Sequence, residues 1–158
     1  MSSVADMGVS VREVPPGPAR RAFVPLIRLA EDSDAQLAAS LDDGTLYAVD
    51  DIGVVLVLDH AEGERELRYV AVAKPRQREG IGRQMLAAVE SAERARGTRR
   101  LLVGTSAADP GNLAFYQRCG FRLLSVERDY FSPARGYPAD FTIDGLLAVD
   151  MVWMDMSL

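Results

Sequence analysis

Residues 74–83, KPRQREGIGR, combine the residue types that bind phosphate groups. They carry four cations against one acid, Glu79, in a chain whose formal net charge is −5. Gly80 and Gly82 would let a ligand approach the main chain closely, and the first amides of a helix have no partner within the helix. Such amides favour an anion. We therefore expect a phosphate-binding turn here, with a helix directly after it.

The spacing of these residues excludes two common phosphate-binding patterns. The dinucleotide pattern GxGxxG needs a third small residue where this chain has Met85, and the P-loop needs GK followed by Ser or Thr. Residues 77–82 instead resemble the (Q/R)xxGx(G/A) pyrophosphate loop of the GCN5-related N-acetyltransferase (GNAT) superfamily. A glycine pattern that only begins a helix is the alternative. The resemblance implies that the co-substrate is acetyl-CoA and that this loop binds it through Gln77, Arg78, Glu79, Gly80, Ile81, Gly82 and Arg83.

A second motif follows in residues 112–121, NLAFYQRCGF. It resembles the segment of the same family in which an Asn and a Tyr precede a Gly-Phe pair. Asp109 can cap a short helix here and Gly120 can end it. Asn112 and Tyr116 are four residues apart, so they share a helix face and could reach one ligand. The resemblance implies that Asn112 contacts the pantetheine arm and that Tyr116 protonates the departing CoA thiolate; the alternative for Tyr116 is a core tyrosine.

Acetyl transfer to an amine calls for a base, because an amine is almost entirely protonated near neutral pH. Glu66 is the candidate, acting directly or through water. It lies eleven residues before Gln77, the offset at which histone-modifying members of the superfamily carry their base. The alternative is an exposed charge at the start of a strand. The resemblance further implies that a main-chain amide near Val72 polarises the thioester carbonyl, provided that this strand has the bulge found in the family.

Few other residues could do chemistry. A single cysteine, Cys119, excludes an internal disulfide framework, and one cysteine with one histidine, His60, cannot build a usual zinc site. We expect no metal, a packed Cys119 and an exposed His60. The acidic balance argues against nucleic-acid binding, and no apolar run is long enough to span a membrane. The sequence therefore predicts a cytoplasmic protein without nucleic-acid or membrane partners.

Hydrophobic periodicity and turn residues predict alternating strands and helices. Helices are expected at residues 19–29, where Pro25 can bend the chain, at 33–41, at 80–96 and after Asp109. Strands are expected at residues 9–14, 45–49, 54–58, 67–73, 101–105, 121–126 and 147–156. The order indicates an α/β fold of three layers. The resemblance implies the GNAT fold, a mixed, mostly antiparallel central sheet flanked by helices. The length fits a single N-acetyltransferase domain at residues 9–158 after a loose tail at residues 1–8.

The resulting hypothesis is an N-acetyltransferase that moves the acetyl group of acetyl-CoA to an amine, small molecule or peptide, by direct ternary-complex transfer. The alternative is a non-catalytic acyl-CoA-binding sensor or interaction module. A homodimer is possible. Acids cluster in residues 31–43 and again from residue 127 onward, and if they border the acceptor site they favour a cationic acceptor. Alternatively, these acids only keep loops solvated.

Overall fold

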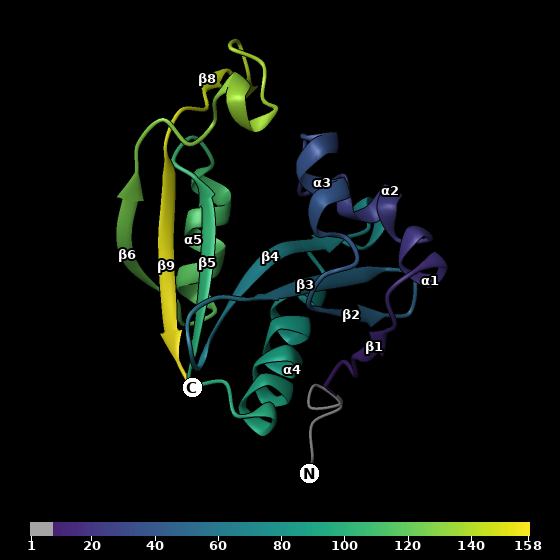
Figure 1. The fold of residues 1–158 in the computed structure, drawn as a ribbon. Coiled ribbons are helices and arrows are strands. Elements are labelled where there is room, and N and C mark those ends of the chain that lie inside the picture. The colour runs from purple at the N-terminus through teal and green to yellow at the C-terminus, as the bar shows by residue number, and fades with distance from the viewer. Residues whose placement is uncertain (1–7) are drawn as a thin grey trace.

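The computed structural model of the chain describes residues 8–158, which build one sheet of seven strands and a separate small hairpin (Figure 1). The order in the large sheet is β1-β2-β3-β4-β5-β9-β6. Its strands are β1 (Arg12–Val14), β2 (Thr45–Val49), β3 (Gly53–Asp59), β4 (Glu64–Val72), β5 (Arg100–Ser106), β6 (Arg122–Glu127) and β9 (Met151–Ser157). Only β4 and β5 run parallel; every other neighbouring pair is antiparallel. The expected mixed, mostly antiparallel sheet is confirmed.

Helices cover both faces of this sheet. They are α1 (Pro18–Arg21), α2 (Val24–Ile27), α3 (Asp34–Ser40), α4 (Ile81–Arg96) and α5 (Pro110–Arg118). The first three pack on one face through Phe23, Ile27 and Leu37. Helices α4 and α5 pack on the other, where Met85 and Tyr116 belong to one buried cluster. The chain therefore has the expected three layers, with apolar side chains filling both spaces between them.

Helix α4 forms where its apolar stripe predicts it. Ile81, Met85 and Val89 recur at helical spacing and are at most 8% exposed, so they face the sheet. Gly80 precedes the helix and Gly97 ends it, both in the left-handed conformation with φ of 80° and 99°. Glycine adopts this conformation without strain.

Three elements differ from the sequence prediction. The helix expected at residues 19–29 is split into α1 and α2, because Pro25 lacks an amide hydrogen and is tolerated only in the first turn of a helix. The last strand begins at Met151 rather than at residue 147, since β8 (Leu146–Leu147) pairs with β7 (Thr142–Ile143) instead. The first strand begins at Arg12 rather than at residue 9. Of the tail expected at residues 1–8, all but Gly8 lies outside the described residues.

The central strands β4 and β5 pair over only part of their length. Glu64 to Leu67 pair with Arg100 to Val103, and beyond that point the two strands diverge. Strand β4 also has a bulge at Arg68, because Leu67 lies opposite Val57 while Tyr69 lies opposite Leu56. The resemblance implied a bulge near Val72; the bulge lies four residues earlier. The divergence opens the sheet between β4 and β5 (Figure 1).

Candidate active site

A cleft of about 920 Å³ lies where β4 and β5 diverge. Its walls come from β4, the turn before α4, the end of β5, the first turns of α5, the connection between α2 and α3, and the loop at residues 130–143. All the expected site residues but one line it, namely Glu66, Val72, Gln77, Arg78, Gly80, Ile81, Gly82, Arg83, Asn112 and Tyr116. The exception is Glu79, which forms an exposed ion pair with Arg76 at 3.0 Å.

The turn before α4 presents main-chain amides to the cleft. Arg78 and Gly80 have positive φ values of 65° and 80°, which turn the chain sharply into the helix. No side chain caps α4, and its first turn contains no acid. The amides at the start of the helix therefore have no intrahelical or side-chain acceptor, and an anion is the ligand that they favour.

Gly82 packs closely against side chains of α5 and β4, which favours a residue without a side chain at this position. A Cβ atom at this position would lie 3.3 Å from a ring carbon of Phe115 and 3.7 Å from a methyl group of Val72. Any larger residue would therefore have to push Phe115 aside. Arg76, Arg78 and Arg83 of this turn line the cleft, whereas the acid of the turn, Glu79, does not. This end of the cleft suits the negatively charged part of CoA.

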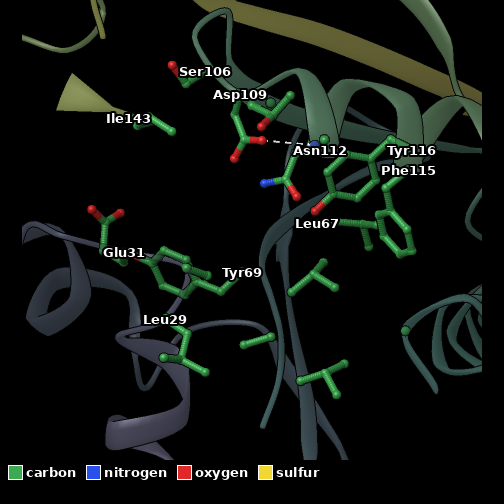
Figure 2. Close-up of a pocket in the computed structure, with 18 of the residues that line it drawn as sticks. Leu29, Glu31, Leu67, Tyr69, Ser106, Asp109, Asn112, Phe115, Tyr116 and Ile143 are labelled. Carbon is green, nitrogen blue, oxygen red and sulfur yellow. Dashed lines mark hydrogen bonds between the residues drawn. The ribbon is translucent and has the colours of Figure 1, made fainter. Parts of the chain in front are cut away.

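Helix α5 brings Asn112 and Tyr116 to the other wall. The carboxylate of Asp109 accepts a hydrogen bond from the Asn112 amide at 3.0 Å and so fixes the start of the helix. Figure 2 shows the two side chains next to each other, both directed into the cleft. Tyr116 is 6% exposed, and within residues 8–158 its hydroxyl has no hydrogen-bond partner. Burial raises the pKa of Tyr116, so that its hydroxyl keeps its proton well above neutral pH.

Glu66 lines the cleft from β4, just before the bulge. Its side chain is 14% exposed and forms an ion pair with Arg68, whose Nη1 lies 3.4 Å from Glu66 Oε1. Arg68 also donates from Nη2 to Gln36 Oε1 of α3 at 2.9 Å. The bulge at Arg68 allows this contact because both Arg68 and Tyr69 then face α3. The Glu66 carboxylate is therefore mostly buried and fixed by an ion pair. It is not an exposed charge at the start of a strand, which was the alternative.

The far end of the cleft combines two of the acids expected at the acceptor site with aromatic residues to which the sequence gave no role. Glu31 and Asp32 follow α2, and an aromatic group comes from the loop before β9: Tyr130, Phe131, Tyr137 and Phe141. The density of aromatic residues in that loop was the only local signal for them. Of the acids expected to border the acceptor site, only Glu31 and Asp32 line the cleft. Those after residue 126 do not, and Glu127 and Asp155 pair with Arg135 and Arg100 instead.

Two further residues lie away from the cleft. Cys119 borders a separate cavity of about 90 Å³, and burial raises the pKa of its thiol. His60 lines a shallow hollow at the opposite end of β3. In the described part of the chain, no three or more His, Cys, Asp or Glu side chains are grouped so as to hold a metal ion. No helix of residues 8–158 is long and apolar enough to cross a membrane.

Comparison with known families decides how this cleft is classified. Residues 42–123 match the family model described as an acetyltransferase (GNAT) domain. The chain belongs to the GNAT family. It is also 31% identical over 138 residues to the uncharacterized N-acetyltransferase YvbK of Bacillus subtilis, an alignment that covers 84% of this chain and 87% of YvbK.

Solved GNAT structures share the fold over nearly the whole chain. The IAA acetyltransferase from Bacillus cereus is 31% identical with a TM-score of 0.82, covering 94% of this chain and 98% of that one. A GNAT acetyltransferase from Elizabethkingia anophelis with acetyl-CoA bound is 26% identical with a TM-score of 0.83, covering 96% and 99%. A Bacillus subtilis acetyltransferase in complex with CoA is 27% identical with a TM-score of 0.81, covering 94% and 98%. GNAT membership supports acetyltransferase activity that depends on acetyl-CoA.

Proposed function

We propose that this GNAT protein transfers the acetyl group of acetyl-CoA directly to an amine while both substrates are bound, with residues 9–158 acting as one domain. One observation carries the proposal. The same cleft contains a basic, glycine-containing turn at one end and, beside it, a protonated Tyr116 whose hydroxyl lacks a partner among the described residues. A protein that only bound CoA would need the turn but not such a hydroxyl.

Acetyl-CoA supplies an activated acetyl group as a thioester. The residues that would hold it are the turn at residues 77–83, through its amides and arginines, and Asn112 from α5. Beyond Leu67 the edge of β4 no longer pairs with β5. Its main-chain groups can therefore bond to an extended substrate as a neighbouring strand would, with the exception of the Val72 carbonyl, which accepts a hydrogen bond from Gln77.

Tyr116 is proposed to protonate the leaving thiolate. A proton donor must be protonated at working pH, and burial secures this by raising the pKa of Tyr116. The ordinary pKa of a thiol, about 8.5, already makes a thiolate a fair leaving group. The contribution of Tyr116 to the rate is therefore expected to be modest.

Glu66 is proposed to accept the proton of the acceptor ammonium, directly or through water. It faces the cleft, and Arg68 fixes one of its oxygens. The ion pair fixes the orientation of the carboxylate, and a base must be positioned within reach of the proton that it accepts. Arg68 is itself held in place by Gln36 of α3, which accepts a hydrogen bond from it.

The test is thiol release from acetyl-CoA in the presence of a panel of amines, combined with calorimetric titration of acetyl-CoA and CoA. Acetyl-CoA binding with thiol release for at least one amine supports the proposal. Tight binding without release for any amine would instead favour a non-catalytic acyl-CoA-binding module. A cytoplasmic location and a homodimer stay predictions of the sequence.

A further inference from the structure

Glu31 is a buried carboxylate with an unbalanced charge at the far end of the cleft. The residue is 9% exposed. Its Oε1 accepts hydrogen bonds from the Tyr137 hydroxyl at 2.7 Å and from the Ser33 amide at 2.9 Å. Within the described chain, no Lys, Arg or His lies within ion-pair distance of it, and Oε2 has no hydrogen-bond partner. Figure 2 shows this carboxylate directed into the cleft from the side opposite Tyr116.

The free oxygen Oε2 of Glu31 is not fully buried, so a ligand in the cleft can reach it, and a carboxylate with little exposure and no cation beside it favours a cationic ligand. The nearby Arg68 forms no ion pair with Glu31, because its two terminal nitrogens bond to Glu66 and Gln36. The acceptor end of the cleft therefore has three acids, Glu31, Asp32 and Glu66, against this one arginine. Negative charge therefore exceeds positive charge at this end of the cleft.

The surroundings of Glu31 are those of a cation-binding pocket. Tyr137, which donates to Glu31, stacks on Phe141 with ring centroids 5.6 Å apart, and Phe131 meets Tyr137 edge-on at 5.0 Å. All three rings line the cleft. Aromatic rings attract ammonium and guanidinium groups, and the attraction is larger where water is excluded.

The cation at Glu31 would not be the amine that reacts. A carboxylate in contact with an ammonium stabilises the protonated form, whereas the reacting amine must lose its proton. Glu31 comes from the connection between α2 and α3, and the proposed proton donor Tyr116 comes from α5 across the cleft (Figures 1 and 2). Glu31 is therefore suited to hold a nitrogen that stays charged while a second nitrogen reaches the thioester.

We propose that Glu31, with the rings of Tyr137, Phe131 and Phe141, binds a second, non-reacting cationic nitrogen of the acceptor. The acceptor class is then a primary amine that carries an amine or guanidine at the other end of an apolar linker. This inference rests on the proposed function for the identity of the reacting amine. It adds a residue that would determine which acceptors are bound, which the proposed acetyl transfer by itself does not specify.

The kinetic test compares α,ω-diaminoalkanes of increasing length with the monoamine and the ω-amino acid of the same length. We expect at least one diamine to exceed its monoamine about tenfold or more in kcat/KM, with the amino acid slowest. Glu31→Gln should raise the KM for that diamine about tenfold with little change in kcat, and should leave the monoamine unaffected. The amide oxygen of Gln still accepts from Tyr137 and Ser33, so the fold is preserved.

The matched control is Asp34→Asn, which removes a negative charge from the same segment. Asp34 is exposed, pairs with Arg28 and does not line the cleft, so this variant should keep the wild-type preference. The subsite is ruled out if no diamine exceeds its monoamine, or if Glu31→Gln leaves the diamine KM unchanged.

A binding measurement separates this inference from the proposed function. Calorimetric titration of the diamines into protein saturated with CoA needs no turnover. Binding that weakens about tenfold in Glu31→Gln supports the subsite even if no thiol is released, in which case only the transfer proposal fails. Binding that is equal in both proteins, or equal for diamine and monoamine, overturns the subsite.

Discussion

The side chain of Gln77 donates a hydrogen bond from Nε2 to the main-chain carbonyl of Val72 over 2.9 Å. The bond ties the phosphate-binding turn to the end of β4. In the family pattern, the first position of the loop is Gln or Arg, and both side chains can donate to a carbonyl. Gln77 is therefore better described as a residue that positions the turn than as a direct contact of the diphosphate.

Replacing Gln77 tests this role. Gln77→Ala should weaken acetyl-CoA binding by about five- to tenfold, since one hydrogen bond that orders the turn is lost. Gln77→Arg should restore most of the affinity because it can bond to the Val72 carbonyl. Calorimetric titration of both variants measures the difference. Equal affinities of Gln77→Ala and wild type would show that the turn does not need this bond.

The parts of the site that the sequence could predict are the local ones. The turn at residues 77–82 and the capped helix with Asn112 and Tyr116 depend on neighbours within a few positions, so their residue types indicate them. The bulge at Arg68 depends on how β4 pairs with Leu56 and Val57 of β3. No local pattern in β4 indicates such a shift in pairing.

The contact between the acids after α2 and the aromatic loop before β9 could not be predicted from the sequence for the same reason. Glu31 and Tyr137 are 106 residues apart and meet only in the folded chain. Likewise, the sequence suggested acids on both borders of the acceptor site. In the folded chain, Glu127 forms an ion pair with Arg135, whereas Glu31 lines the cleft. The sequence does not distinguish these two environments.

Two substitutions at Gly82 distinguish steric from electrostatic effects on acetyl-CoA binding. Gly82→Ala places a methyl group against Phe115 and should weaken acetyl-CoA binding only slightly if that ring moves. Gly82→Asp adds a negative charge next to the turn where the diphosphate is proposed to bind and should weaken acetyl-CoA binding about a hundredfold. Circular dichroism establishes that both variants fold. If a folded Gly82→Asp protein bound acetyl-CoA with unchanged affinity, the diphosphate would not bind at this turn.

Glu66→Gln should change the pH dependence of turnover. Without a base, the rate should fall most near neutral pH and recover toward high pH, where more of the amine is already neutral. The readout is kcat/KM between about pH 6 and 10, a span that brackets the ordinary amine range. If the pH profile of Glu66→Gln were parallel to that of the wild type, the base would be another residue or water.

Tyr116→Phe should give a different phenotype. It removes only the proton donor, so kcat should fall about ten- to a hundredfold while acetyl-CoA affinity changes little. Because burial raises the pKa of Tyr116, the wild-type kcat should not decline through this group up to about pH 10. A decline in wild type that Tyr116→Phe abolishes would place the pKa of Tyr116 lower than its burial implies.

Glu93 anchors a buried polar network on the side of the sheet that faces α4. It is fully buried, accepts from the hydroxyls of Tyr47 and Thr98 at 2.7 Å each, and pairs with Arg65 at 2.6 Å. Glu93→Ala should lower the free energy of unfolding by about 3 kcal/mol or more, since it removes the buried partner of Arg65 and leaves that guanidinium with an ion pair to the exposed Asp59.

Urea denaturation measures that loss, with Glu90→Ala as the control. Glu90 lies on the same helix and pairs with Arg94 near the surface, so its removal should cost no more than about 1 kcal/mol. Equal losses in the two variants would mean that the network around Glu93 adds nothing beyond an ordinary surface pair.

Alkaline pH should destabilise the fold through its buried tyrosines. Burial raises the pKa values of Tyr47 and Tyr137, and the carboxylates of Glu93 and Glu31 raise them further. The folded chain thus holds protons that the unfolded chain releases near pH 10, so the stabilisation is complete below about pH 10 and is lost as the pH rises toward the folded-state values. Melting temperatures measured from about pH 8 to 11 should fall at the upper end. The fall should be smaller in Tyr137→Phe, which has no proton to lose there; an identical fall would assign the alkaline instability to other groups.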